Sequence, residues 1–130
     1  MRLSKVVRGL NRENLTISGT GVLQVTGGTG YTSHGISVRG ELTIQNGNIT
    51  AMGLEAQGVS AIYAYSGITI NGGTVAAIAN NATAGYSRGF ECFGNIRING
   101  GNVVAKAGEV NTNFTTYKSY GIDTSSIFIT

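Results

Sequence analysis

Short runs in which apolar and polar residues alternate recur along the whole chain. The clearest begin as Leu-Thr-Ile at residue 15, Leu-Thr-Ile at 42, Ile-Thr-Ile at 68, Ile-Arg-Ile at 96 and Ile-Phe-Ile at 127. These starts are 27, 26, 28 and 31 residues apart. Alternation is typical of a β-strand with one buried face, and a period of about 20 to 50 residues is typical of a solenoid.

Each period holds three such runs, which we call the first, second and third run. A glycine-containing corner precedes the second run and a longer loop precedes the third. Three strands this short enclose no core, so successive units must coil on one another, each strand pairing in parallel with its equivalent about 4.8 Å away. The sequence therefore predicts an all-β fold, a right-handed parallel β-helix of three strands per coil.

The inward positions predicted from this alignment form columns of like residues. The first-run column is Leu15/Ile17, Leu42/Ile44, Ile68/Ile70, Ile96/Ile98 and Ile127/Ile129. The third-run column is Ile36/Val38, Ile62/Ala64, Phe90/Cys92 and Ile122/Thr124. Polar residues follow the first runs at Ser18, Gln45, Asn71 and Asn99, where stacked amides can hydrogen-bond along the axis. Glycines 47, 73 and 101 share the next corner, and we expect them to adopt positive φ.

The repeats also set the expected domain organisation. Residues 1–14 are expected to form an N-terminal cap or a preceding partial coil, and residues 15–130 the β-helix, with coils starting near 15, 42, 68, 96 and 127. The chain ends at Thr130 inside a strand, whereas terminal repeats normally carry a polar cap. We therefore expect a fragment of a longer protein, with an open rung that can pair end to end with other copies.

Composition excludes several classes of protein. With 21 glycines, no proline and only 12% charged residues, the chain resembles neither a disordered segment nor collagen. The net charge of +3 is spread along the chain, which argues against nucleic-acid binding. No apolar stretch reaches the length of a membrane helix, and residues 1–10 lack the apolar region of a signal peptide. We expect no membrane insertion.

One string is specific enough to suggest relatives. Ile-Thr-Ile-Asn-Gly-Gly-Thr-Val-Ala-Ala from residue 68, echoed by Ile-Arg-Ile-Asn-Gly-Gly-Asn-Val-Val-Ala from residue 96, resembles repeats of exported bacterial β-helix proteins. Such repeats occur in large cell-surface proteins and in a carbohydrate-binding β-helix family similar in shape to pectate lyases. The resemblance covers nearly the whole chain after Asn14 and implies a secreted or cell-surface location. It does not select a function, because this scaffold carries lyases, hydrolases and adhesins alike.

Catalysis on this scaffold needs clustered carboxylates, for calcium or for acid and base chemistry. Asp123 is the single aspartate. Glu91 and Asp123 take equivalent outward positions one coil apart, either sharing a cation or proton or lying solvated on the surface. Calcium-binding relatives tend to carry acidic turns beside this strand, where this chain has His34, Arg88 and Tyr120. That departure argues against a metal, and we expect no cofactor.

Nucleophilic catalysis finds no support either. His34 is the only histidine, and three coils separate it from Asp123, about 14 Å by strand spacing, too far for a Ser-His-Asp relay. Cys92, the only cysteine, falls at an inward position, where it is expected to pack as a small apolar residue. We therefore expect no catalytic residue and no enzyme.

Insertions gather at the corner between the second and third runs, where the steps between inward residues are 11, 11, 13 and 17. Insertions on one side of a solenoid often mark its binding face, and aromatic rings there can stack on sugars. The candidate sugar-binding residues on these loops are Tyr31, Tyr86, Phe114, Tyr117 and Tyr120. The alternative is that the rings fold down and shield their own loops. A second, flatter candidate on the third runs is Tyr63, Tyr65 and Phe93.

The expected function is a non-catalytic polysaccharide-binding or adhesive module of a secreted or cell-surface bacterial protein. Its partners would be a polysaccharide, such as a host or cell-wall glycan, and other copies of the chain. Two alternatives stay open: a structural stalk that binds nothing, and a fragment of a polysaccharide lyase or hydrolase.

Overall fold

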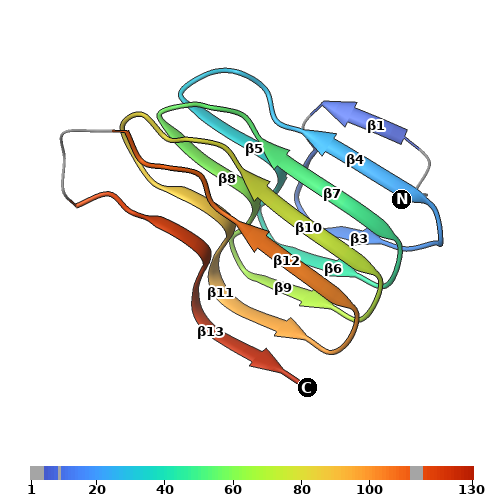
Figure 1. Ribbon diagram of the computed structural model, residues 1–130. Helices are drawn as coiled ribbons and strands as arrows, with labels where there is room; N and C mark the ends of the chain where they lie inside the picture. Colours follow the sequence, from blue (N-terminus) through green and yellow to red (C-terminus); the bar gives the residue numbers. More distant parts are fainter. Residues whose placement is uncertain (1–4, 9, 112–115) are drawn as a thin grey trace.

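The chain coils into a parallel β-solenoid of about four turns (Figure 1). The computed structural model describes residues 5–8, 10–111 and 116–130, which form thirteen strands and no helix. The strand pairings are all parallel, as in β4 with β7 and β5 with β8. The described residues contain no helix that is long and apolar enough to cross a membrane. The predicted all-β solenoid is confirmed.

Two sheets enclose the core. The second runs form a five-stranded sheet of β1 (Lys5–Arg8), β4 (Val22–Thr26), β7 (Asn48–Gly53), β10 (Thr74–Ala79) and β12 (Asn102–Lys106). The other sheet has eight strands: β2 (Leu10–Arg12), β3 (Leu15–Ile17), β5 (Thr32–Val38), β6 (Glu41–Ile44), β8 (Gly58–Ala64), β9 (Gly67–Ile70), β11 (Ser87–Ile98) and β13 (Ser119–Ile129). Strands β1 and β2 pair with β4 and β5 and so precede the first complete coil.

Strand β11 joins the third and first runs into one sheet, because it passes through both of them. It pairs with β8 up to Cys92 and with β9 from Asn95 onward, and its pairing with β13 shifts register between these two residues. Gly94 lies at this bend, where an added Cβ would overlap the carbonyl oxygen of Ser66. The close approach of two coils therefore requires glycine at position 94.

The predicted inward columns form the core in the earlier coils, whereas Ile127 and Ile129, also placed in the first-run column, are 41% and 71% exposed in the last coil. Ile17, Ile44 and Ile70 are fully buried in the first-run column, and Phe90 is buried in the third-run column. The prediction that Ile98 is buried in the same way was wrong, since it is only half-buried and packs at the margin of the core. The reason is its place near the last coil, where the five-stranded sheet ends at β12.

The third-run register is confirmed by Cys92, which is 2% exposed and belongs to the core cluster. Its Sγ lies 3.8 Å from the carbonyl oxygen of Asn95. Burial raises the pKa of the Cys92 thiol, so the reactive thiolate is disfavoured at this position.

The corner after the first run confirms two further predictions. Asn71 Nδ2 donates to Gln45 Oε1 and Asn99 Nδ2 donates to Asn71 Oδ1, each at 2.9 Å. Gly47, Gly73 and Gly101 have φ angles of 115°, 88° and 89°, a region that residues with a Cβ rarely adopt. The amide ladder and the glycine corner hold successive coils in the same register.

We predict that Ile70→Asp unfolds the chain, because Ile70 is fully buried and burying an unpaired carboxylate costs several kcal/mol. The control is Thr69→Asp, the same substitution at the neighbouring half-buried position on the outer face. Thermal unfolding followed by circular dichroism distinguishes them: Ile70→Asp should lose the β signal at ambient temperature, and Thr69→Asp should retain it. Equal melting temperatures would contradict the inward assignment of Ile70.

Candidate functional site

The outer side of strands β5, β8, β11 and β13 gathers aromatic and charged residues, and we call it the third-run face. Two outward rows cross these strands. The first row pairs His34, Ser60, Arg88 and Tyr120, and the second pairs Ser37, Tyr63, Glu91 and Asp123.

Two successive inward residues separate these rows on each strand. In β5 they are Gly35 and Ile36, and in β11 they are Gly89 and Phe90, all of them buried. A Cβ on Gly89 would meet the carbonyl oxygen of Gly121 at 2.6 Å. The small residue lets neighbouring coils approach here, and it leaves the outward side chains of both rows on the same face.

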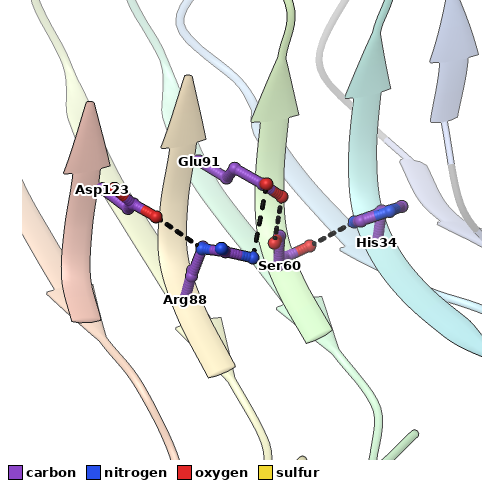
Figure 2. Close-up of polar contacts among 5 residues, drawn as sticks. All are labelled: His34, Ser60, Arg88, Glu91 and Asp123. Carbon is purple, nitrogen blue, oxygen red and sulfur yellow. Dashed lines mark hydrogen bonds and ion pairs between the residues drawn. The ribbon is translucent and has the colours of Figure 1, made fainter. Parts of the chain in front are cut away.

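A charged network connects the two rows. Arg88 Nε donates to Asp123 Oδ2 at 2.7 Å, and Arg88 Nη1 lies 3.3 Å from Glu91 Oε2. Ser60 Oγ donates to Glu91 Oε1 at 2.7 Å, and His34 Nδ1 lies 3.0 Å from the Ser60 carbonyl oxygen. Figure 2 shows these five side chains lying across four neighbouring strands. The network therefore ties together all four third-run strands that make the face.

The structure confirms that Glu91 and Asp123 are neighbours, since they pair directly between β11 and β13. The structure modifies both interpretations of this pair, the shared cation or proton and the two solvated carboxylates. The positive charge beside the two carboxylates is the guanidinium of Arg88, which comes from the other outward row. The Glu91 side chain is 14% exposed, so it is not a freely solvated carboxylate. The column alignment placed the carboxylates correctly and did not show that a long side chain three residues earlier reaches both.

Three of the predicted aromatic residues come together at the loop end of the face, and we call Tyr86, Tyr117 and Tyr120 the loop cluster. The Tyr86 ring lies edge-on to Tyr117 at 5.1 Å between centroids, and 6.1 Å from Tyr120. The guanidinium of Arg88 lies over the Tyr86 ring at 4.1 Å. Arg88 therefore connects the loop cluster to both carboxylates.

The other two predicted aromatic residues are not part of this cluster. Tyr31 is 77% exposed and lies before β5, two coils away from β11. No ring contact joins it to the loop cluster among the ring pairs of the described residues. Phe114 lies outside the residues that the structure describes. The loop cluster therefore comes from the later coils, where the loops are longest.

A second group of rings lies at the opposite end of the same face, and we call Tyr63, Tyr65 and Phe93 the corner cluster. Phe93 packs edge-on against Tyr65 at 5.4 Å and Tyr63 at 6.1 Å. The ring of Tyr63 stacks on His34 at 5.5 Å. Burial raises the pKa of the Tyr63 phenol, and the charge of Glu91 raises it further, so this hydroxyl keeps its proton at neutral pH.

Comparison with known proteins places the chain in a family. A family model described as carbohydrate-binding domain-containing protein matches residues 10–129. The class defined by the fold is the parallel β-solenoid, and the chain belongs to this carbohydrate-binding domain-containing family. The predicted resemblance to a carbohydrate-binding β-helix family is confirmed at that level. No curated protein and no solved structure matches the chain.

We predict that Arg88→Ala lowers the free energy of unfolding by about 2 kcal/mol. Removing the guanidinium leaves two neighbouring carboxylates without their cation. The loss of stability should lie between that of breaking a surface salt bridge and that of breaking a buried one. The control is Arg39→Ala, because Arg39 pairs with Glu13 at 2.9 Å with side chains 69% and 76% exposed. Urea unfolding should show little change for Arg39→Ala. Equal losses in the two variants would contradict the structural role of Arg88.

Proposed function

We propose that the chain is a non-catalytic polysaccharide-binding module of a secreted or cell-surface bacterial protein. We further propose that sugar binds on the third-run face, with the loop cluster as its platform. The observation that carries this proposal is the contact of Tyr86, Tyr117 and Tyr120 beside the Arg88 network. Family membership supports carbohydrate as the class of ligand.

The chemistry of this face suits a sugar. A sugar ring has an apolar side that packs on an aromatic ring and hydroxyl groups that need hydrogen-bond partners at its rim. Asp123 lies beside the cluster with its side chain 41% exposed, and a carboxylate has acceptor capacity beyond its one bond to Arg88. Each hydroxyl that donates to Asp123 would meet an ionised acceptor, which makes a stronger hydrogen bond than a neutral one.

The same network supports binding over cleavage. Glycoside hydrolysis requires one carboxyl group that donates a proton and a second that acts as a base or nucleophile. Glu91 and Asp123 both pair with the Arg88 guanidinium, so one cation already engages both carboxylates. A fragment of a lyase or hydrolase is therefore the less favoured alternative.

The test is retention on insoluble cellulose, pectin and mucin. We expect the native chain to be retained on at least one polymer and the Tyr86→Ala/Tyr117→Ala variant to be retained at least about tenfold less, since each ring contributes about 1 kcal/mol. Phe128→Ala is the control, because Phe128 is 44% exposed and contacts Arg97, away from the cluster. It should bind as the native chain does.

Three outcomes would count against the proposal. Equal retention of the double variant would remove the loop cluster from the site. No retention on any polymer would favour a stalk that binds nothing. Release of unsaturated sugars from pectin would overturn the non-catalytic assignment.

We also propose that copies of the chain associate end to end. Within the described residues, β12 pairs only with β10 and β13 only with β11, so both have a free edge. Between them lies an apolar groove lined by Ile98, Val103, Ala105, Ile122, Ile127 and Ile129. At the other end of the five-stranded sheet, β1 runs in the same direction, and in the part of the chain that the structure describes it pairs only with β4. A second copy can therefore continue the sheet with its own β1.

We predict concentration-dependent association in sedimentation velocity, and its loss in Ile129→Lys. The Ile129 side chain is 71% exposed at the free edge of β13, so a lysine there would place a charge in the interface without disturbing the core. The control is Tyr65→Lys, an equally charged change at a residue that is 57% exposed and follows β8 in the middle of the stack, away from both ends. A native chain that stays monomeric at high concentration would contradict the proposal.

A further inference from the structure

The loop cluster and the corner cluster lie at opposite ends of one strand. Tyr86 immediately precedes β11 and Phe93 lies within its bend, seven residues later. At about 3.3 Å per residue in a β-strand, this separation is about 20 Å. Arg88 and Glu91 lie between the two ends and face the same side. The third-run face thus has aromatic rings at each end and hydrogen-bonding groups in the middle.

We infer that the corner cluster is a second sugar subsite, and that the face binds one linear oligosaccharide running along the strands. This inference rests on the proposed function of the loop cluster and adds the direction and length of its ligand. The Phe93 and Tyr65 rings are 58% and 57% exposed, so they are open to a ligand. Their edge-on contact at 5.4 Å fixes both rings against each other.

An oligosaccharide that contacts both clusters has to run along the strands and not along the solenoid axis. Along the solenoid axis, the coil that precedes Tyr86 presents Gly58 and Gln57 at the loop end, as shown by the bond from Val59 N to Tyr86 O. A sugar chain that left the loop cluster along the axis would therefore meet no ring on that coil. A chain that follows β11 passes Arg88, Glu91 and Tyr63 before it reaches Phe93.

The middle of the face is held in place before any ligand arrives. Arg88, Glu91 and Asp123 are fixed by their mutual bonds, and Ser60 fixes Glu91 from the other side. Donors and acceptors that need no rearrangement cost less entropy on binding. A sugar unit between the two clusters would therefore add hydrogen bonds, although stacking at both ends would carry most of the affinity.

This arrangement predicts a selection by chain length. A short oligosaccharide fills one cluster only, whereas a long one joins both and gains from the second at high effective concentration. Stacking on one ring corresponds to about fivefold in affinity. Two rings of the corner cluster then correspond to about 25-fold, which appears only once the oligosaccharide spans about 20 Å.

The experiment is calorimetric titration with oligosaccharides of increasing length, from the disaccharide to the octasaccharide. The probes are cello-oligosaccharides if cellulose retains the chain, oligogalacturonides if pectin does, and N-acetyllactosamine oligomers if mucin does. The native chain should bind the longest probes at least tenfold more tightly than the shortest. The Tyr65→Ala/Phe93→Ala variant should bind short probes at the loop cluster only and lose about 25-fold in affinity for the longest ones.

The outcomes separate this inference from the proposed function. Both substituted rings are more than half exposed, so the variant is expected to fold, and its melting temperature checks this. Two outcomes would overturn the second subsite without affecting the proposal for the loop cluster. In the first, the affinity of the native chain does not rise with probe length; in the second, the variant binds long probes as tightly as the native chain does. Failure of the native chain to bind any probe or polymer would overturn both.

Discussion

Parallel pairing of each strand with its equivalent one coil later is the interaction on which the whole structure depends. It brings Ile44 next to Ile70 and Asn71 next to Asn99, so a residue type that is favourable in one coil is favourable in the next. Backbone hydrogen bonds in such a ladder are the same for any sequence, whereas the register is specified by side chains. The buried isoleucine column and the amide ladder at the corner that follows it supply that specification.

The same pairing builds the candidate site. Residues that lie about 27 positions apart in the sequence become neighbours on one face, which is how His34, Ser60 and Arg88 share a row. A single coil contributes two or three groups and makes no site by itself. The charged network exists because four successive coils each add one strand, and the loop cluster exists because the last two loops are long enough to bring Tyr117 to Tyr86.

Sequence alone predicted the features that follow from repetition. The strand columns, the positive φ of Gly73, the burial of Cys92 and the pairing of Glu91 with Asp123 all follow from alignment of the coils. Sequence alone did not predict contacts between side chains that belong to different columns. Alignment cannot show that Arg88 reaches across to the next outward row. Nor can it show which rings on equivalent loops touch: among the described residues Tyr86 contacts Tyr117 and Tyr120, and no ring contact joins Tyr31 to them.

A binding face on strands differs physically from one on loops. The outward groups of β11 are held by pairing with β8 and β13 on both sides, so little conformational entropy is lost when a ligand arrives. Loops adapt to a ligand more readily but lose more freedom in doing so. Here the loops supply only Tyr86 and Tyr117, and Arg88 anchors the Tyr86 ring to the strand network. The strands therefore determine where the loop side chains of the candidate site are presented, and Arg88 links the strand groups to them.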